Sequence, residues 1–147
     1  MNNNKTKMMN KNESWQTFHI WLLVSVVILG CHALNPISFF TYNSVQSFCI
    51  FTFISIIVLC ILAAYTGNVY WFPGIDYDDA ENAGRKACRK YGIWNLLIYL
   101  AAFVCYLFYC WLKSRAFVNS STHHAIAGAV ILTFAVVFAG KIPLQKR

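Results

Sequence analysis

Histidine has the widest chemical range of the residue types in this chain, and the chain contains four. Three of them lie at the ends of apolar segments: His32 near the end of the first, and His123 and His124 at the start of the fourth. If the segments are helices that alternate in direction, these imidazoles meet at one level, where they could bind a metal or a haem iron. Cofactor sites in helical bundles are usually built in the bundle core, however. We therefore favour interfacial histidines that point into lipid headgroups, and we expect no metal and no cofactor.

The six cysteines show no pattern typical of a thiol site. None forms a C-x-x-C pair, the usual signature of a dithiol redox centre or a zinc ribbon. Most lie in apolar segments, where a free cysteine acts as a small hydrophobe. Cys31 differs because it follows Leu29-Gly30 and a basic start, as the lipidated cysteine of a bacterial lipoprotein signal does. Leu29 fits that signal poorly, so we expect the first segment to be an uncleaved helix.

Acidic residues are absent from every apolar segment of the sequence. The five acids are Glu13, Asp76, Asp78, Asp79 and Glu81. Proton- and cation-coupled transporters generally hold an ionisable group inside the bundle, so this absence argues against that class. The sequence also shows no nucleophile–base pair and no metal-ligand spacing. We expect a protein that is not an enzyme.

Four long apolar segments must position these residues, and the composition requires that lipid surround them. Hydrophobic residues make up 59% of the 147 residues and charged residues 12%, whereas a soluble domain has about 25% charged residues. A chain this short cannot bury so much apolar surface by itself. The segments cover about residues 18–37, 48–66, 93–112 and 122–142, each close to the roughly 20 residues that cross a bilayer. The sequence therefore predicts an all-α integral membrane protein, a four-transmembrane-helix bundle over residues 18–147, after a disordered tail over residues 1–17.

The basic residues predict the orientation of this bundle. With the N-terminus in the cytoplasm, only Lys113 and Arg115 of the 12 Lys and Arg residues lie outside. The positive-inside rule then favours N-in and C-in, and Tyr70, Trp71 and Phe72 fall at the inner membrane surface. We expect a multi-pass protein of a bacterial inner (plasma) membrane. The net charge of +7 is explained by topology and lipid contact, so we expect no nucleic-acid partner.

One long connection, Pro73 to Gly92, carries a charge pattern of its own. Its acids come first and its bases last, an order that complements a helix dipole, and Gly92 is typical of a helix stop. We expect a short amphipathic cytoplasmic helix between the second and third spans, lying on the membrane. Its charged residues are the candidate surface for a partner or for lipid: Asp76, Asp78, Asp79, Glu81, Arg85, Lys86, Arg89 and Lys90.

Two helix faces are candidates for packing. Small residues let helices approach closely inside a membrane, and the fourth segment carries Ala125, Gly128, Ala129, Ala135 and Ala139. They can pack within one chain or between chains. The third segment carries a mildly polar stripe with helical spacing, made of Asn95, Tyr99, Ala102, Tyr106 and Tyr109. We favour helix–helix contacts for this stripe, and the alternative is the lining of a substrate path.

These features favour a small accessory protein. The leading hypothesis is a polytopic inner-membrane protein that packs against a membrane partner, either another membrane protein or a second copy of itself, in an assembly, regulatory or toxin-immunity role. It depends on the small-residue faces and on the charged connection. The alternative is a small transporter or channel subunit. A third hypothesis is a haem- or quinone-linked redox subunit of a membrane complex.

Overall fold

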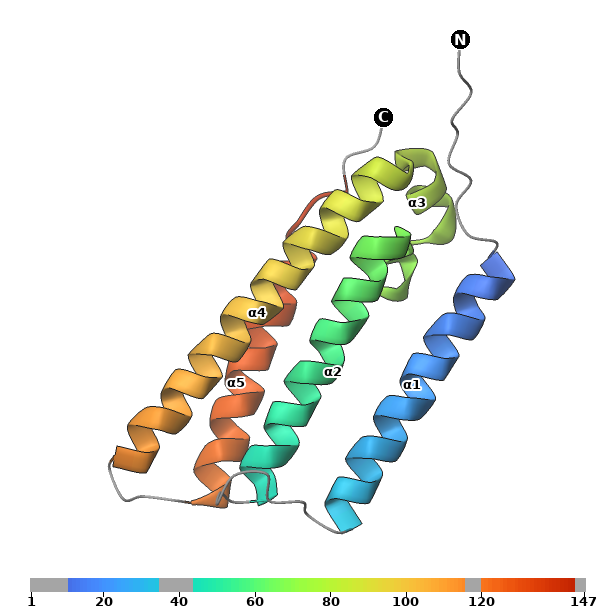
Figure 1. Cartoon of the computed structure of the whole chain (residues 1–147). Helices are drawn as coiled ribbons and strands as arrows, with labels where there is room; N and C mark the ends of the chain where they lie inside the picture. The colour runs from blue at the N-terminus through green and yellow to red at the C-terminus, as the bar shows by residue number, and fades with distance from the viewer. Residues whose placement is uncertain (1–10, 35–43, 116–119, 145–147) are drawn as a thin grey trace.

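The computed structural model describes residues 11–34, 44–115 and 120–144, which contain helices and no strand (Figure 1). Four of the helices are long and apolar enough to cross a membrane. Between the second and third of these, the chain forms a 3-10 helix and one short α-helix. The elements are α1 Lys11–Leu34, α2 Ser44–Thr66, η1 Val69–Trp71, α3 Tyr77–Ala83, α4 Arg85–Arg115 and α5 Ser121–Gly140.

The four long helices alternate in direction, and three of them form the packed centre (Figure 1). Helix α2 packs along α4, and α5 contacts both. Helix α1 packs on α2, to one side of this group. The first residues of α1, the elements η1 and α3, the start of α4 and the last residues of α5 all lie at one end of the bundle. We call this end the charged end.

Helix boundaries differ from the predicted ones in two places. Helix α1 begins at Lys11, so residues 11–17, predicted as part of a disordered tail, are helical; residues 1–10 lie outside the described residues, as do residues 35–37 of the predicted first span. Helix α4 begins at Arg85 and has 31 residues, about 46 Å at 1.5 Å per residue. It is therefore longer than a hydrocarbon core of about 30 Å.

The sequence predicts one amphipathic helix between Pro73 and Gly92, but this segment forms the short helix α3 and the first turns of α4. Helix α3 holds the acids, and it ends at Gly84, which has a φ of 81°. A residue with a side chain rarely adopts this left-handed conformation, so Gly84 separates α3 from α4. The four basic residues of the connection consequently lie in the first two turns of α4.

Gly92 is not a helix stop, because it lies inside α4, where this helix comes closest to α2. A Cβ atom added to Gly92 would lie 2.8 Å from both the Cα and the N atom of Ala64. The missing side chain is therefore what allows the two backbones to touch.

Much of the best-buried part of the molecule lies at the charged end. The sequence predicts Tyr70, Trp71 and Phe72 at the level of the inner membrane surface, and the structure buries their side chains within the protein, with only 7–8% of each exposed. Trp71 packs 6.0 Å from the ring of Phe18 on α1, and Phe72 packs 6.2 Å from Tyr91 on α4. Burial raises the pKa of the Tyr70 phenol above its ordinary value. Tyr70, Trp71 and Phe72 form an aromatic cap, which contacts both α1 and α4 beside the end of α2.

Candidate functional site

The structure does not bring the three histidines predicted at one membrane level into a common metal site. His32 is buried, with Nε2 3.4 Å from the carbonyl oxygen of Ser44. His124 is buried elsewhere in the packing, with Nδ1 3.9 Å from Sγ of Cys110, whereas His123 is exposed. Within residues 11–34, 44–115 and 120–144, no group of three or more His, Cys, Asp or Glu residues is placed to hold a metal ion.

A polar cluster that the sequence does not reveal lies where α2, α4 and α5 meet, away from the charged end. The Tyr106 side chain is fully buried there, and the Cys110 thiol lies 3.9 Å from Nδ1 of His124. The Cys49 thiol also lies 3.9 Å from the carbonyl oxygen of His124. Thiols are weak donors and acceptors, and both thiols of this cluster contact polar atoms of His124. Its members come from three helices, so no sequence spacing marks it.

The polar stripe of α4 faces the interior of the bundle. Asn95, Tyr99 and Tyr106 are buried, and Ala102 and Tyr109 are half-buried. The Asn95 amide donates to the carbonyl oxygen of Tyr91, one turn earlier on the same helix. The Tyr109 hydroxyl donates to the carbonyl oxygen of His123 on α5, at 3.1 Å. These contacts favour the prediction that the stripe joins helices.

The small residues of α5 divide between two faces. Gly128, Ala135 and Ala139 are buried, as the packing prediction requires. A Cβ on Gly128 would lie 2.9 Å from Sγ of Cys49, so this glycine makes room for α2. Ala125 and Ala129 are exposed, so these two do not pack within the chain. They remain available for contact with another molecule.

Two of the four bases at the start of α4 have a structural role. The Arg89 guanidinium donates from Nε to the carbonyl oxygen of Ala64 at 3.2 Å. That carbonyl belongs to the last turn of α2, where backbone oxygens have no partner within the helix and where a cation is favoured by the helix dipole. The Arg85 Cγ lies 3.1 Å from the position of a Cβ at Gly67. Arg89 therefore stabilises the junction between α2 and α4, and the Arg85 side chain packs beside Gly67 at the same place.

The other two bases of this group face outward. Lys86 and Lys90 are exposed. Of the acids on the neighbouring α3, Asp76, Asp78 and Glu81 are exposed, and Asp79 is half-buried. Asp78 and Asp79 lie in the first turn of α3, where the helix dipole favours negative charge. Arg89 is exposed as well, so the predicted partner surface keeps Lys86, Arg89 and Lys90 together with the acids of α3.

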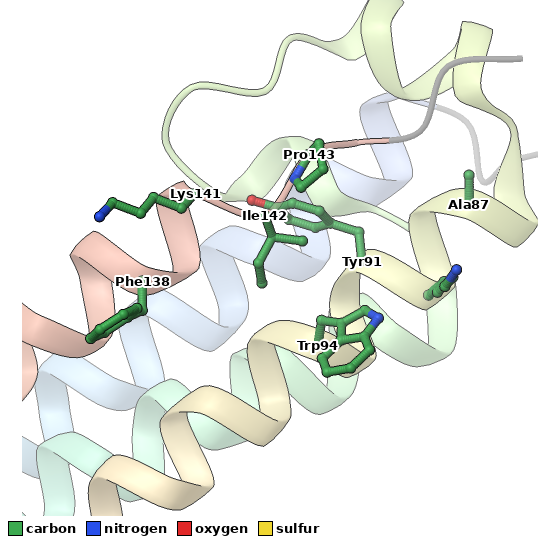
Figure 2. Close-up of a pocket in the computed structure, with 8 residues that line it drawn as sticks. Ala87, Tyr91, Trp94, Phe138, Lys141, Ile142 and Pro143 are labelled. Atoms are coloured by element: carbon green, nitrogen blue, oxygen red, sulfur yellow. The ribbon is translucent and has the colours of Figure 1, made fainter.

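A pocket of about 380 Å³ lies beside this surface, between the start of α4 and the end of α5 (Figure 2). Helix α4 contributes Ala87, Lys90, Tyr91 and Trp94, and the end of α5 contributes Phe138, Lys141, Ile142 and Pro143. Trp94 projects from α4, and Phe138 projects from α5 (Figure 2). The pocket therefore combines two ammonium groups with apolar and aromatic walls, a lining that the sequence does not predict because the two segments are far apart in the chain.

The described residues form an all-helical protein with four helices long and apolar enough to cross a membrane, and with a charged end that is closed by an aromatic cap. Comparison with known proteins adds no narrower class. No family model, no curated protein and no solved structure matches this chain.

Proposed function

We propose that this chain is a multi-pass protein of a cell inner membrane, not an enzyme, which acts by packing against another membrane protein. The role is that of an accessory protein, in assembly, in regulation or in immunity to a membrane-active toxin. The observation that carries the proposal is the isolation of α1. In the most apolar stretch of α1, only 6% is buried against the rest of the protein, whereas in that of α2 the buried share is 33%.

The inner face of α1 holds to α2 through a narrow strip. The Trp21 indole donates to the carbonyl oxygen of Ser55 at 3.1 Å, and the Ser55 hydroxyl donates to Ser25 at 2.5 Å. On the opposite face, Leu23 is 65% exposed and Val27 is 53% exposed. A helix held by one strip leaves this outer face free to contact a second membrane protein.

The exposed pair Ala125 and Ala129 supports the same proposal from α5. The two alanines are four residues apart, so they lie on one face of the helix. Small residues at this spacing let another helix approach closely in lipid. The pair is exposed beside the inward-facing residues of α5, so a partner helix can reach it without any rearrangement of the bundle.

The orientation part of the proposal has a direct test. Reporter fusions after Arg147 and within 76–90 are expected to report the cytoplasm, and fusions near Asn43 or Ser120 the outside. The reason is the positive-inside rule, since only Lys113 and Arg115 lie on the outer side. A cytoplasmic signal near Asn43 would mean that α1 does not cross, and the four-span topology would be rejected.

The packing part is tested by photo-crosslinking in native membranes. A photoreactive residue at Val27 is expected to give a discrete protein adduct, because this side chain lies on the open face of α1. Val137 on α5 is the matched control: it is the same residue type, 49% exposed against 53%, and it faces away from the bundle. The mass of the adduct distinguishes a different protein from a second copy of this chain. Lipid adducts alone at both positions would contradict the proposal.

A further inference from the structure

The pocket between α4 and α5 lies at a defined level of the bundle. Measured back from Lys113, which the proposed topology places at the outer surface, about 20 residues of α4 cross a core of roughly 30 Å. That length reaches Ile93. Trp94 therefore lies at the inner boundary of the hydrocarbon, and Lys90 lies one turn beyond it, at the depth of the lipid headgroups. Lys141 follows the last residue of α5, at the same end.

The lining suits an amphiphilic anion. Lys90 and Lys141 are both exposed, and none of the described residues that line the pocket is acidic. The Lys141 ammonium lies 5.8 Å from the centre of the Phe138 ring, and its side chain extends away from Trp94 and Tyr91 (Figure 2), so it reaches a ligand in the pocket by a change of rotamer. Trp94 and Phe138 are 50% and 57% exposed and continue the wall toward the membrane interior. Positive charge at the mouth and aromatic surface below it match a phosphate that is joined to acyl chains.

We propose that this pocket binds the phosphate headgroup of an anionic phospholipid, with Lys90 and Lys141 on the phosphate and the acyl chains along Trp94 and Phe138. The proposal requires the membrane insertion that the proposed function assumes. The bound lipid bridges α4 and α5 at the charged end. It would thereby hold the short segment after α5 against the start of α4.

The test measures lipid binding to the purified full-length protein by native mass spectrometry, with phosphatidylglycerol and phosphatidylcholine as probes. We expect the wild type to retain phosphatidylglycerol in preference to phosphatidylcholine. Two lysines near an anionic headgroup contribute enough that K90Q/K141Q should bind phosphatidylglycerol roughly thirtyfold more weakly. The control K113Q/R115Q removes the same charge from the other end of α4, outside the pocket, and it should retain wild-type binding. Circular dichroism verifies the fold of each variant.

Each other outcome overturns the proposal. Equal binding by the wild type and K90Q/K141Q would show that the pocket is not the site. An equal loss in K113Q/R115Q would show general attraction to positive charge. Thermal stabilisation by inorganic phosphate as large as that by the lipid would show a site for a soluble anion. Extraction of the protein from membranes by sodium carbonate would instead reject the proposed function, whereas membrane retention without lipid preference rejects the pocket alone.

Discussion

Replacing Gly92 with leucine is expected to prevent the bundle from folding, because α2 and α4 touch through this residue. A Cβ there would already lie 2.8 Å from two backbone atoms of Ala64, and backbone cannot move aside as a flexible side chain can. Alanine at this position should cost about 1–3 kcal/mol, the usual cost of overpacking. Leucine adds three further carbon atoms to the same contact and should leave no folded protein to purify.

Gly30 provides the matched control, since it is also a glycine inside a long apolar helix. No atom lies within 4 Å of a Cβ built on Gly30. Alanine there should therefore be neutral, or should stabilise α1 by up to about 1 kcal/mol through its higher helix propensity. Thermal unfolding in detergent, followed by circular dichroism, compares the variants. If Gly92→Ala and Gly30→Ala unfold at the same temperature, the close approach of α2 and α4 at Ala64 is wrong.

The long helices could be predicted from the sequence because length and apolarity are local properties. The role of Gly92 could not, because a glycine after a basic run also resembles a helix stop. What distinguishes the two is the backbone of Ala64, which the chain brings to this position from 28 residues away. A glycine needed for a turn and a glycine needed for a contact look the same in one sequence.

The charged connection shows the same limit. Its acids and bases are in the order that suits one helix dipole, and this suggests a single helix. In the structure, Gly84 divides the connection, and the bases lie at the start of α4, where that helix's own dipole disfavours them. Arg89 reaches instead the end of α2, at Ala64. A helix dipole therefore does favour Arg89, but it is the dipole of α2. No periodicity in the connection identifies α2 as the neighbour of this residue.

The rotation of α5 about its own axis explains why some of its small residues are buried and others are exposed. The sequence identifies α5 as rich in small residues, but two strips of them lie side by side on the helix. The contacts that place Gly128 against Cys49 turn Ala135 and Ala139 inward and leave Ala125 and Ala129 outside. The inward strip could have been suggested by adding His124, which lies one turn before Gly128 and is buried with it. The choice between the strips depends on α2 and α4.

Replacing Trp71 with alanine is expected to destabilise the protein by about 3–5 kcal/mol, the usual cost of removing a large aromatic side chain from a core. Trp71 is only 7% exposed and packs on Phe18 of α1 and on Tyr70. The loss should be largest at the start of α1, because few other contacts hold this helix. Hydrogen exchange by mass spectrometry should show faster exchange in the first turns of α1, with α4 less affected.

Trp111 is the control for this change, because it is 51% exposed, near the opposite end of the bundle. Its ring stacks on Phe108 and lies 5.4 Å from the Arg115 guanidinium, contacts that are worth about 1 kcal/mol each at an exposed site. Trp111→Ala should therefore lower the unfolding temperature far less than Trp71→Ala and leave exchange in α1 unchanged. Trp71→Phe should recover much of the loss, since most of the buried ring surface returns. If Trp71→Ala and Trp111→Ala unfold alike, the aromatic cap does not hold α1 to the bundle, and the isolation of that helix is greater than the structure indicates.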